Sequence, residues 1–124
     1  MTSYITLEEA LRIHEVLIDA FGGAHGVRDM GLLESALLRP QTGYYGDLIE
    51  EAAALWESLA MNHPFVDGNK RVAYAVVELF LQSNGLDILP DDKTIETFIY
   101  HHLDAGTFRK DILDAWLRDN TEPL

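Results

Sequence analysis

The sequence predicts an all-α fold of about six helices in a single domain that spans residues 1–124. The chain has 124 residues, of which 48% are hydrophobic, enough to bury one core and typical of one domain. Six segments carry apolar residues at helical spacing, and most of them are bounded by capping residues, glycine or proline. The segment Gln41 to Leu48 shows neither helical caps nor a long alternation, so we expect a loop or a short β-hairpin there.

The first two helices are delimited by caps and by helix-breaking residues. The stretch Thr6–Glu9 has the pattern of a capping box and opens an amphipathic helix that the glycine pair at 22–23 ends. After a glycine-punctuated loop, Asp29 can cap a shorter helix, which we expect to end at Pro40. Each of these helices should therefore bury one apolar stripe.

The remaining helices include one that should be central. A third helix is expected from Glu50 to about Met61, because the proline at position 64 disfavours helix just before it. The fourth, from Arg71 to Ser83, is apolar on nearly every side, as is typical of a helix in the middle of a bundle. The last expected elements are an extended segment at 86–90 and helices at 94–105 and 108–119.

Composition excludes several functional classes. The chain has 9 basic and 21 acidic side chains and a formal charge of -12, the wrong sign for neutralising nucleic-acid phosphates. It has no cysteine and no apolar run near the length of a membrane span. We therefore expect a soluble cytoplasmic protein that binds neither nucleic acid nor membrane directly, and whose charge suits basic partner segments.

The stretch from His63 to Arg71 carries the candidate chemistry. It leads into the N-terminus of the helix expected to be buried, where unpaired backbone N–H groups and the helix dipole favour an anion. Gly68 allows close backbone approach, and Lys70 and Arg71 add positive charge suited to phosphate oxygens. The Gly68–Arg71 segment is therefore a candidate phosphate-binding nest.

Three further side chains complete the parts that phosphoryl or nucleotidyl transfer requires. Asn69 can donate from its amide to a phosphate oxygen, Asp67 can hold a hydrated Mg²⁺ ion, and His63 can accept a proton near neutral pH. Taken singly, each has a structural explanation: a helix end, a turn or a solvated surface. Their coincidence within nine residues favours a site, whereas Phe65 is best explained as a core anchor for the loop.

The pattern His-Pro-Phe-x-Asp-Gly-Asn-Lys-Arg resembles the signature of the Fic/Doc family. Similarity to its death-on-curing (Doc) branch extends to Gly23-x-x-Gly26-x-x-Asp29 and to the stretch 33–41. The resemblance implies the helical Fic/Doc fold, with His63 as general base, Asp67 as Mg²⁺ ligand and the nest, including Arg71, on the phosphates of ATP or another nucleoside triphosphate. It also implies a target-docking flap at Gln41–Asp47, with Gly43, Tyr44 and Tyr45 at its centre.

Two positions bear on the reaction. Fic enzymes that transfer AMP usually carry glycine where this chain has Lys70, and a second arginine where it has Tyr74. The resemblance to the Doc branch therefore favours a toxin that transfers the γ-phosphate to a Ser/Thr hydroxyl of a translation factor, with elongation factor Tu implied. An AMP transferase is the alternative. No self-inhibitory [Ser/Thr]-x-x-x-Glu-[Gly/Asn] motif is found, so silencing by a cognate antitoxin in trans is expected.

Two hypotheses of other classes remain open at this point. The domain can be a catalytically silent binding module that acts with its antitoxin, although the intact His63, Asp67, Asn69 and Arg71 argue against it. A metal hydrolase would need ligands from the remaining histidines, and the chain offers no His-x-x-x-His spacing for them. Those histidines are His14, His25, His101 and His102.

Overall fold

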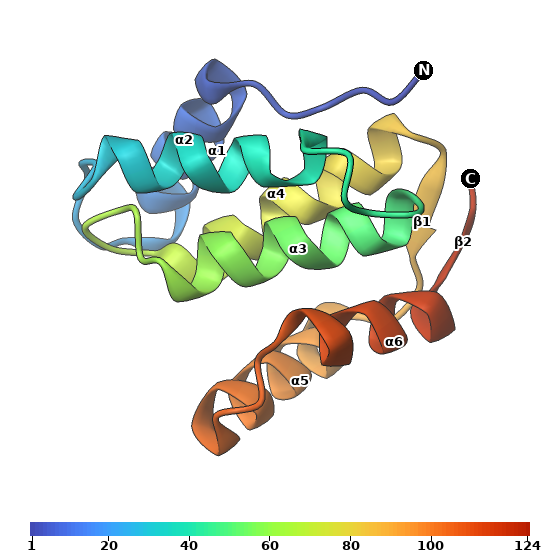
Figure 1. Ribbon diagram of the computed structural model, residues 1–124. Helices are drawn as coiled ribbons and strands as arrows, with labels where there is room; N and C mark the ends of the chain where they lie inside the picture. The colour runs from blue at the N-terminus through green and yellow to red at the C-terminus, as the bar shows by residue number, and fades with distance from the viewer.

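The computed structural model describes all 124 residues and confirms the all-α prediction (Figure 1). The α-helices are α1 (Leu7–Phe21), α2 (Met30–Leu38), α3 (Leu48–Met61), α4 (Asn69–Ser83), α5 (Asp92–Ala105) and α6 (Lys110–Asn120). A short 3-10 helix, η1 (Arg39–Gln41), follows α2, and the strands β1 (Leu86–Ile88) and β2 (Thr121–Pro123) form a small antiparallel sheet.

Helices α3 and α4 pack together at the centre of the molecule. Helix α1 lies on α4, whereas α2 and α6 lie on α3. Trp56 of α3 is fully buried and contacts an aromatic cluster from α4, α5 and α6, in which Phe98 stacks on Trp116 with ring centroids 4.6 Å apart. This cluster fastens the α5–α6 pair, which lies below the other helices in Figure 1, to the central pair.

Side-chain caps fix most of the helix starts. The predicted capping box of α1 is present, since the Thr6 hydroxyl accepts the Glu9 N–H at 3.1 Å and the Glu9 carboxylate accepts the Thr6 N–H at 2.9 Å. Asp29 caps α2, and two further aspartates cap α3 and α5. Helix α4 differs from these four, because Gly68 precedes it and no side chain caps it.

The structure decides between the two alternatives for the segment after η1 and shifts several helix boundaries by about two residues. The segment after η1 is a loop without strands, and the small sheet instead joins β1 to the end of the chain. Helix α2 ends at Leu38, because Pro40 lies within the tighter turn of η1. Helix α4 begins at Asn69, two residues earlier than predicted, so the candidate nest forms its first turn.

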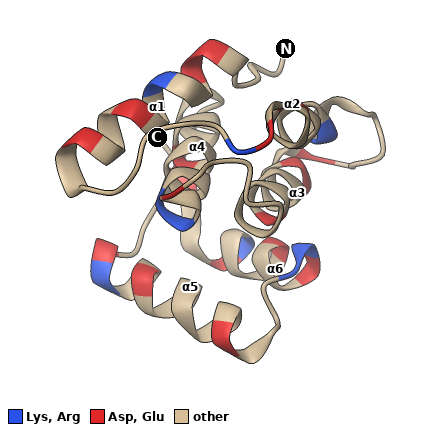
Figure 2. Ribbon diagram, turned by 90° about the vertical axis from the view of Figure 1, so that its left-hand side faces the viewer, with Lys and Arg blue, Asp and Glu red and all other residues tan.

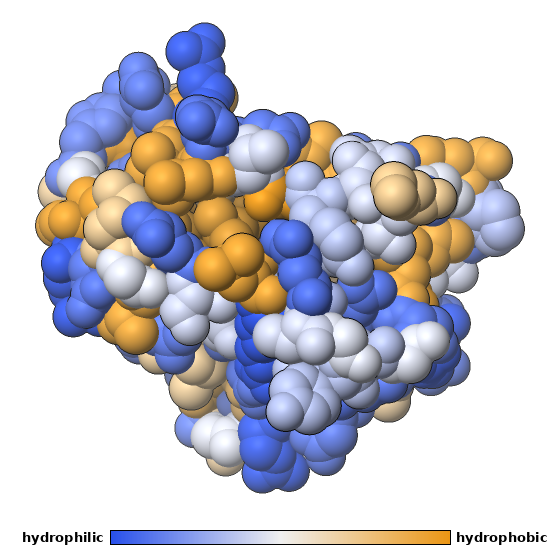
Figure 3. All heavy atoms as spheres, turned by 45° about the horizontal axis from the view of Figure 1, so that its top comes forward, coloured by the Kyte–Doolittle hydropathy of each residue, from blue (hydrophilic) through white to orange (hydrophobic).

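The surface is mainly acidic and polar. Acidic residues are spread over the helices, whereas basic residues are few (Figure 2). Seen from the side of α1 and α2, apolar side chains gather in a broad patch left of centre and again at the right, between hydrophilic ones (Figure 3). The exposed large apolar side chains of these two helices are Val16, Phe21, Met30 and Leu38. None of the helices has the length and apolarity that crossing a membrane requires.

Candidate active site

The loop from His63 to Gly68 is anchored by one aromatic side chain. Phe65 is 2% exposed, and its ring stacks on the buried His14 with centroids 4.0 Å apart. The Asn69 side chain accepts the Phe65 N–H at 2.9 Å and donates to the Phe65 carbonyl at 3.0 Å. Phe65 is therefore the predicted anchor, and Asn69, proposed as a phosphate donor, uses one of its two amide N–H bonds to hold the loop.

A second loop, residues 22–29, lies alongside the first and holds it in place. An isolated antiparallel bridge pairs Val27 with Phe65, and the Val66 N–H donates to the Gly26 carbonyl at 3.0 Å. The Arg28 guanidinium donates to the His63 carbonyl at 2.7 Å and to the Asn62 carbonyl at 2.8 Å. These bonds hold His63 in a left-handed conformation with φ at 49°, which is uncommon for a residue other than glycine.

Asp67 is oriented by backbone donors from both loops. Its carboxylate accepts the Ala24 N–H at 3.1 Å and the Gly68 N–H at 2.9 Å. These two hydrogen bonds, the one from Ala24 first, hold the pKa of Asp67 below its ordinary value, so the carboxylate is ionised near neutral pH. The His14 ring donates to the Asp67 carbonyl at 3.0 Å. An oriented, ionised carboxylate with free lone pairs is a suitable Mg²⁺ ligand.

The start of α4 presents open backbone donors. Gly68 has φ at 76°, a left-handed conformation that glycine adopts without steric cost. The amides of Asn69, Lys70 and Arg71 have no acceptor in the protein, and the Val72 N–H is the first of the helix to bond a carbonyl. Together with the helix dipole, these amides can hold an anion such as a phosphate group.

The two cations of this turn form no ion pair. Of the seven other lysines and arginines, four lie within 4 Å of a carboxylate, but Lys70 and Arg71 do not. The Lys70 ammonium instead lies 4.9 Å from the centre of the Tyr100 ring, and the Arg71 guanidinium lies 4.3 Å from that of Phe21. In a chain with 21 acidic side chains, these two positive charges are left for a ligand.

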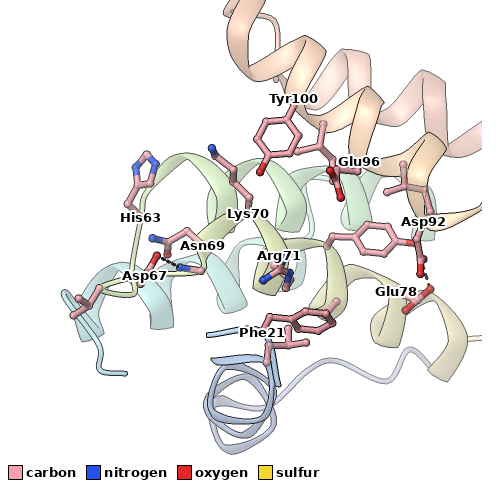
Figure 4. Close-up of a pocket in the computed structure, with 17 residues that line it drawn as sticks. Phe21, His63, Asp67, Asn69, Lys70, Arg71, Glu78, Asp92, Glu96 and Tyr100 are labelled. Carbon is pink, nitrogen blue, oxygen red and sulfur yellow. Dashed lines mark hydrogen bonds between the residues drawn. The ribbon is translucent and has the colours of Figure 1, made fainter. Parts of the chain in front are cut away.

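The loop and the first turn of α4 open into a cleft of about 600 Å³, a volume that suits a nucleotide (Figure 4). His63, Asp67 and the Gly68–Arg71 nest, which the sequence singled out, all line this cleft. Its walls come from the end of α1, one face of α4 and one face of α5, with acidic side chains at the end away from His63. The wall residues are Leu17 and Phe21, then Tyr74, Ala75 and Glu78, then Asp92, Ile95, Glu96, Ile99 and Tyr100.

The segment expected to form the docking flap does not line this cleft. Gly43, Tyr44 and Tyr45 are absent from its walls, and Tyr45 instead receives a hydrogen bond from Arg39 at 2.8 Å and packs beside Lys110 of α6. The segment that pairs with the active-site loop is 22–29. The sequence signal for this segment was its three glycines, which have positive φ in the structure, whereas the α5 wall had no sequence signal.

Tyr74 occupies the position where an AMP transferase would carry arginine. Its hydroxyl donates to a Glu78 carboxylate oxygen at 3.2 Å. Burial, and then the negative charge of Glu78, raise the pKa of Tyr74, so the phenol stays neutral. This part of the cleft therefore presents carboxylates and no cation to a ligand.

The other histidines lie in separate pairs. The rings of His14 and His25 lie 6.5 Å apart, and His101 and His102 are neighbours on α5. No group of three or more His, Asp or Glu side chains is placed to hold a metal ion. This arrangement speaks against the metal-hydrolase hypothesis, which needs three protein ligands on one metal.

The fold and the site define a helical protein in which a cationic loop–helix junction faces a nucleotide-sized cleft. Sequence comparison gives the family, because a sequence model of the Fic/DOC family matches residues 4–81. The chain is 46% identical over 96 residues to "Toxin Doc" of Mycolicibacterium smegmatis (strain ATCC 700084 / mc(2)155), covering 73% of this chain and 72% of that protein. It is 34% identical over 89 residues to "Protein kinase doc" of Escherichia phage P1, covering 68% and 71%. The chain belongs to the Fic/DOC family, in its Doc branch.

Proposed function

We propose that this protein is a Doc-like toxin that phosphorylates a Ser/Thr hydroxyl of a translation factor, with elongation factor Tu as the expected target. One relative is named a toxin and the other a protein kinase, which supports the proposal. The observation that carries it is the first turn of α4, where three open amides and two cations without carboxylate partners face the cleft. His63 lines the same cleft.

In the proposed reaction, the nest holds the phosphates of a nucleoside triphosphate, and His63 is the general base. His63 takes the proton of the target hydroxyl as its oxygen forms a bond to the γ-phosphorus, and the bond from the γ-phosphorus to the bridging oxygen breaks to release the diphosphate. Asp67 would hold Mg²⁺, which neutralises phosphate charge when bound. Lys70 and Arg71 supply the remaining positive charge, Lys70 as a point charge and Arg71 as a planar fork.

Charge along the cleft supports γ-phosphate transfer over AMP transfer. Glu78 follows Arg71 by two turns of α4, a rise of about 10 Å, and shares its end of the cleft with Asp92 (Figure 4). Carboxylates repel phosphates but can accept hydrogen bonds from ribose hydroxyls. We therefore place the nucleoside toward Glu78 and the terminal phosphate toward His63, an orientation that presents the γ-phosphate to the base.

Regulation in trans follows from the same proposal. A Doc-like toxin requires a cognate antitoxin, and the formal charge of -12 favours a basic antitoxin segment by long-range attraction. The site of action would be the cytoplasm, where the translation machinery lies. The alternative of a silent binding module predicts antitoxin binding without any transfer.

The test is a transfer assay with magnesium, purified elongation factor Tu or a bacterial lysate, and ATP labelled at either the α or the γ position. His63→Ala is the inactive variant, and His101→Ala is the control, because His101 is exposed on α5 and does not line the cleft. Transfer of γ-label alone, lost in His63→Ala and kept in His101→Ala, is the expected result. Transfer of α-label would indicate an AMP transferase, and transfer of neither label would favour the binding module.

A further inference from the structure

Two aromatic side chains that line the cleft are exposed to solvent. Phe21, the last residue of α1, is 64% exposed, and Tyr100 of α5 is 47% exposed. Both line the cleft, Phe21 on the α1 side and Tyr100 on the α5 side (Figure 4). Neither ring is enclosed in the core, so each can present its face to a charged side chain in the cleft.

Each ring holds one cation of the nest. The Lys70 nitrogen is 4.9 Å from the Tyr100 ring centre, and the Arg71 guanidinium carbon is 4.3 Å from the Phe21 ring centre. Both distances lie within the roughly 6 Å range of a cation–π interaction. The two cations of the nest are thus directed by rings from two different helices, α5 and α1.

A carboxylate would hold the same cations at a cost to the site. Glu96 also lines the α5 wall, yet no ion pair forms between it and either cation. An ion pair would cancel the positive charge and occupy N–H donors. An aromatic face attracts the cation through its quadrupole and leaves the net charge and the N–H groups for another ligand.

We propose that Tyr100 and Phe21 are positioning residues that preorganise Lys70 and Arg71 for the phosphates of the nucleotide. This inference rests on the proposed function. Tyr100 lies outside residues 4–81, the part of the chain that matches the family. The C-terminal helices therefore contribute to the anion site through a residue that the family motif does not contain. Restricting a flexible cation before binding lowers the entropy lost when the phosphate arrives.

The first test compares side chains at position 100 by titrating the purified full chain with magnesium and a non-hydrolysable ATP analogue. Tyr100→Leu removes the aromatic face and should raise Kd about two- to fivefold, the size expected for one exposed cation–π contact. Tyr100→Phe keeps the ring and should bind within about 1.5-fold of the wild type. Phe21→Leu and Phe21→Tyr should repeat this pattern for Arg71.

The second test asks whether Tyr100 acts through Lys70. Lys70→Met weakens binding on its own, and Tyr100→Leu should then add no further loss, because the cation that the ring positions is gone. Lys93→Met is the charge control, since Lys93 is exposed on α5 and does not line the cleft. Thermal unfolding of each variant reports whether the fold is intact.

The outcomes separate this inference from the proposed function. If the wild type binds the analogue and Tyr100→Leu binds it equally well, the positioning role is overturned and the proposed function stands. The same holds if Tyr100→Leu loses as much affinity in the Lys70→Met background as in the wild-type background. Tighter binding by Tyr100→Leu would overturn it as well, since the ring would then be withholding Lys70. Absence of nucleotide binding by the wild type would overturn the proposed function and this inference with it.

Discussion

Gly23 is the residue whose replacement should most directly disturb the proposed Mg²⁺ site. A Cβ at this position would lie 2.7 Å from Oδ2 of Asp67 and 3.1 Å from Cδ1 of Ile18. Gly23→Ala must therefore push the Asp67 carboxylate away, and Oδ2 is the oxygen that accepts the Ala24 N–H. The variant should retain the carboxylate but lose its orientation.

Gly22→Ala is a matched control in the same loop. Both glycines have positive φ, 89° at Gly22 and 113° at Gly23, but a Cβ at Gly22 would meet nothing within 4 Å. Each substitution should cost about 1–3 kcal/mol of backbone strain, or a fall in Tm of roughly 3–6 °C for each kcal/mol. Only Gly23→Ala should weaken Mg²⁺ binding, by about tenfold or more, as loss of a group that orients a metal ligand typically does.

The assay is a magnesium titration at a fixed concentration of the non-hydrolysable ATP analogue, with thermal unfolding measured in parallel. The expected result is a similar loss of stability in both variants and a loss of Mg²⁺ affinity in Gly23→Ala alone. Equal Mg²⁺ affinity in the two variants would refute the reasoning, since it would show that the orientation of Asp67 does not matter to the ion.

Three further predictions concern stability, each measured by urea denaturation. Phe65→Ala should lower the free energy of unfolding by about 3–5 kcal/mol, because the ring is buried and a cavity would remain; a loss below 1 kcal/mol would contradict its anchoring role. Thr6→Ala removes the side-chain cap of α1 and should lower the free energy of unfolding by about 0.5–2 kcal/mol. Thr97→Ala is the comparison, because Thr97 lies within α5 and caps no helix. The Arg118 side chain and the Glu50 N–H lower the pKa of Asp47, so its stabilising contribution is present above about pH 5 and is lost as the pH falls through the lowered pKa. Asp47→Asn should reduce the fall in the free energy of unfolding at acidic pH, and an unchanged fall would count against the ion pair.

Local signals in the sequence predicted most of the helices and the part of the candidate site that the His63–Arg71 stretch forms. The cap residues Thr6 and Asp29 act on the helix that follows them directly, and the His63–Arg71 stretch is continuous in the chain. Such features depend on neighbours in sequence, so they can be read before the fold is known. The family resemblance depended on the same continuous stretch and was confirmed by comparison.

Features that depend on distant parts of the chain could not be predicted. β1 pairs with β2 through Leu86 and Pro123, and a three-residue strand has too short a pattern to show its partner. The contact of Lys70 with Tyr100 requires that α5 face α4 across the cleft, an arrangement that no local pattern encodes. The flap at 41–47 was expected from the family resemblance alone, and the pairing of the loop at 22–29 with the site through an isolated bridge is a contact between distant parts of the chain.

Both ends of the chain are hydrogen-bonded to the turn that follows α4. Ser3 exchanges hydrogen bonds with the side chain of Asn84, and the Leu124 N–H donates to the Gly85 carbonyl. These two neighbouring residues follow α4, so they lie about 22 Å along the helix from the turn that forms the nest. We expect a force that pulls residues 3 and 124 apart to act on these hydrogen bonds first and to leave the loop from His63 to Gly68 unloaded. We therefore expect that a short peptide could join residues 3 and 124, giving a circular chain whose new termini could be opened at the exposed residues 42–44, away from the cleft.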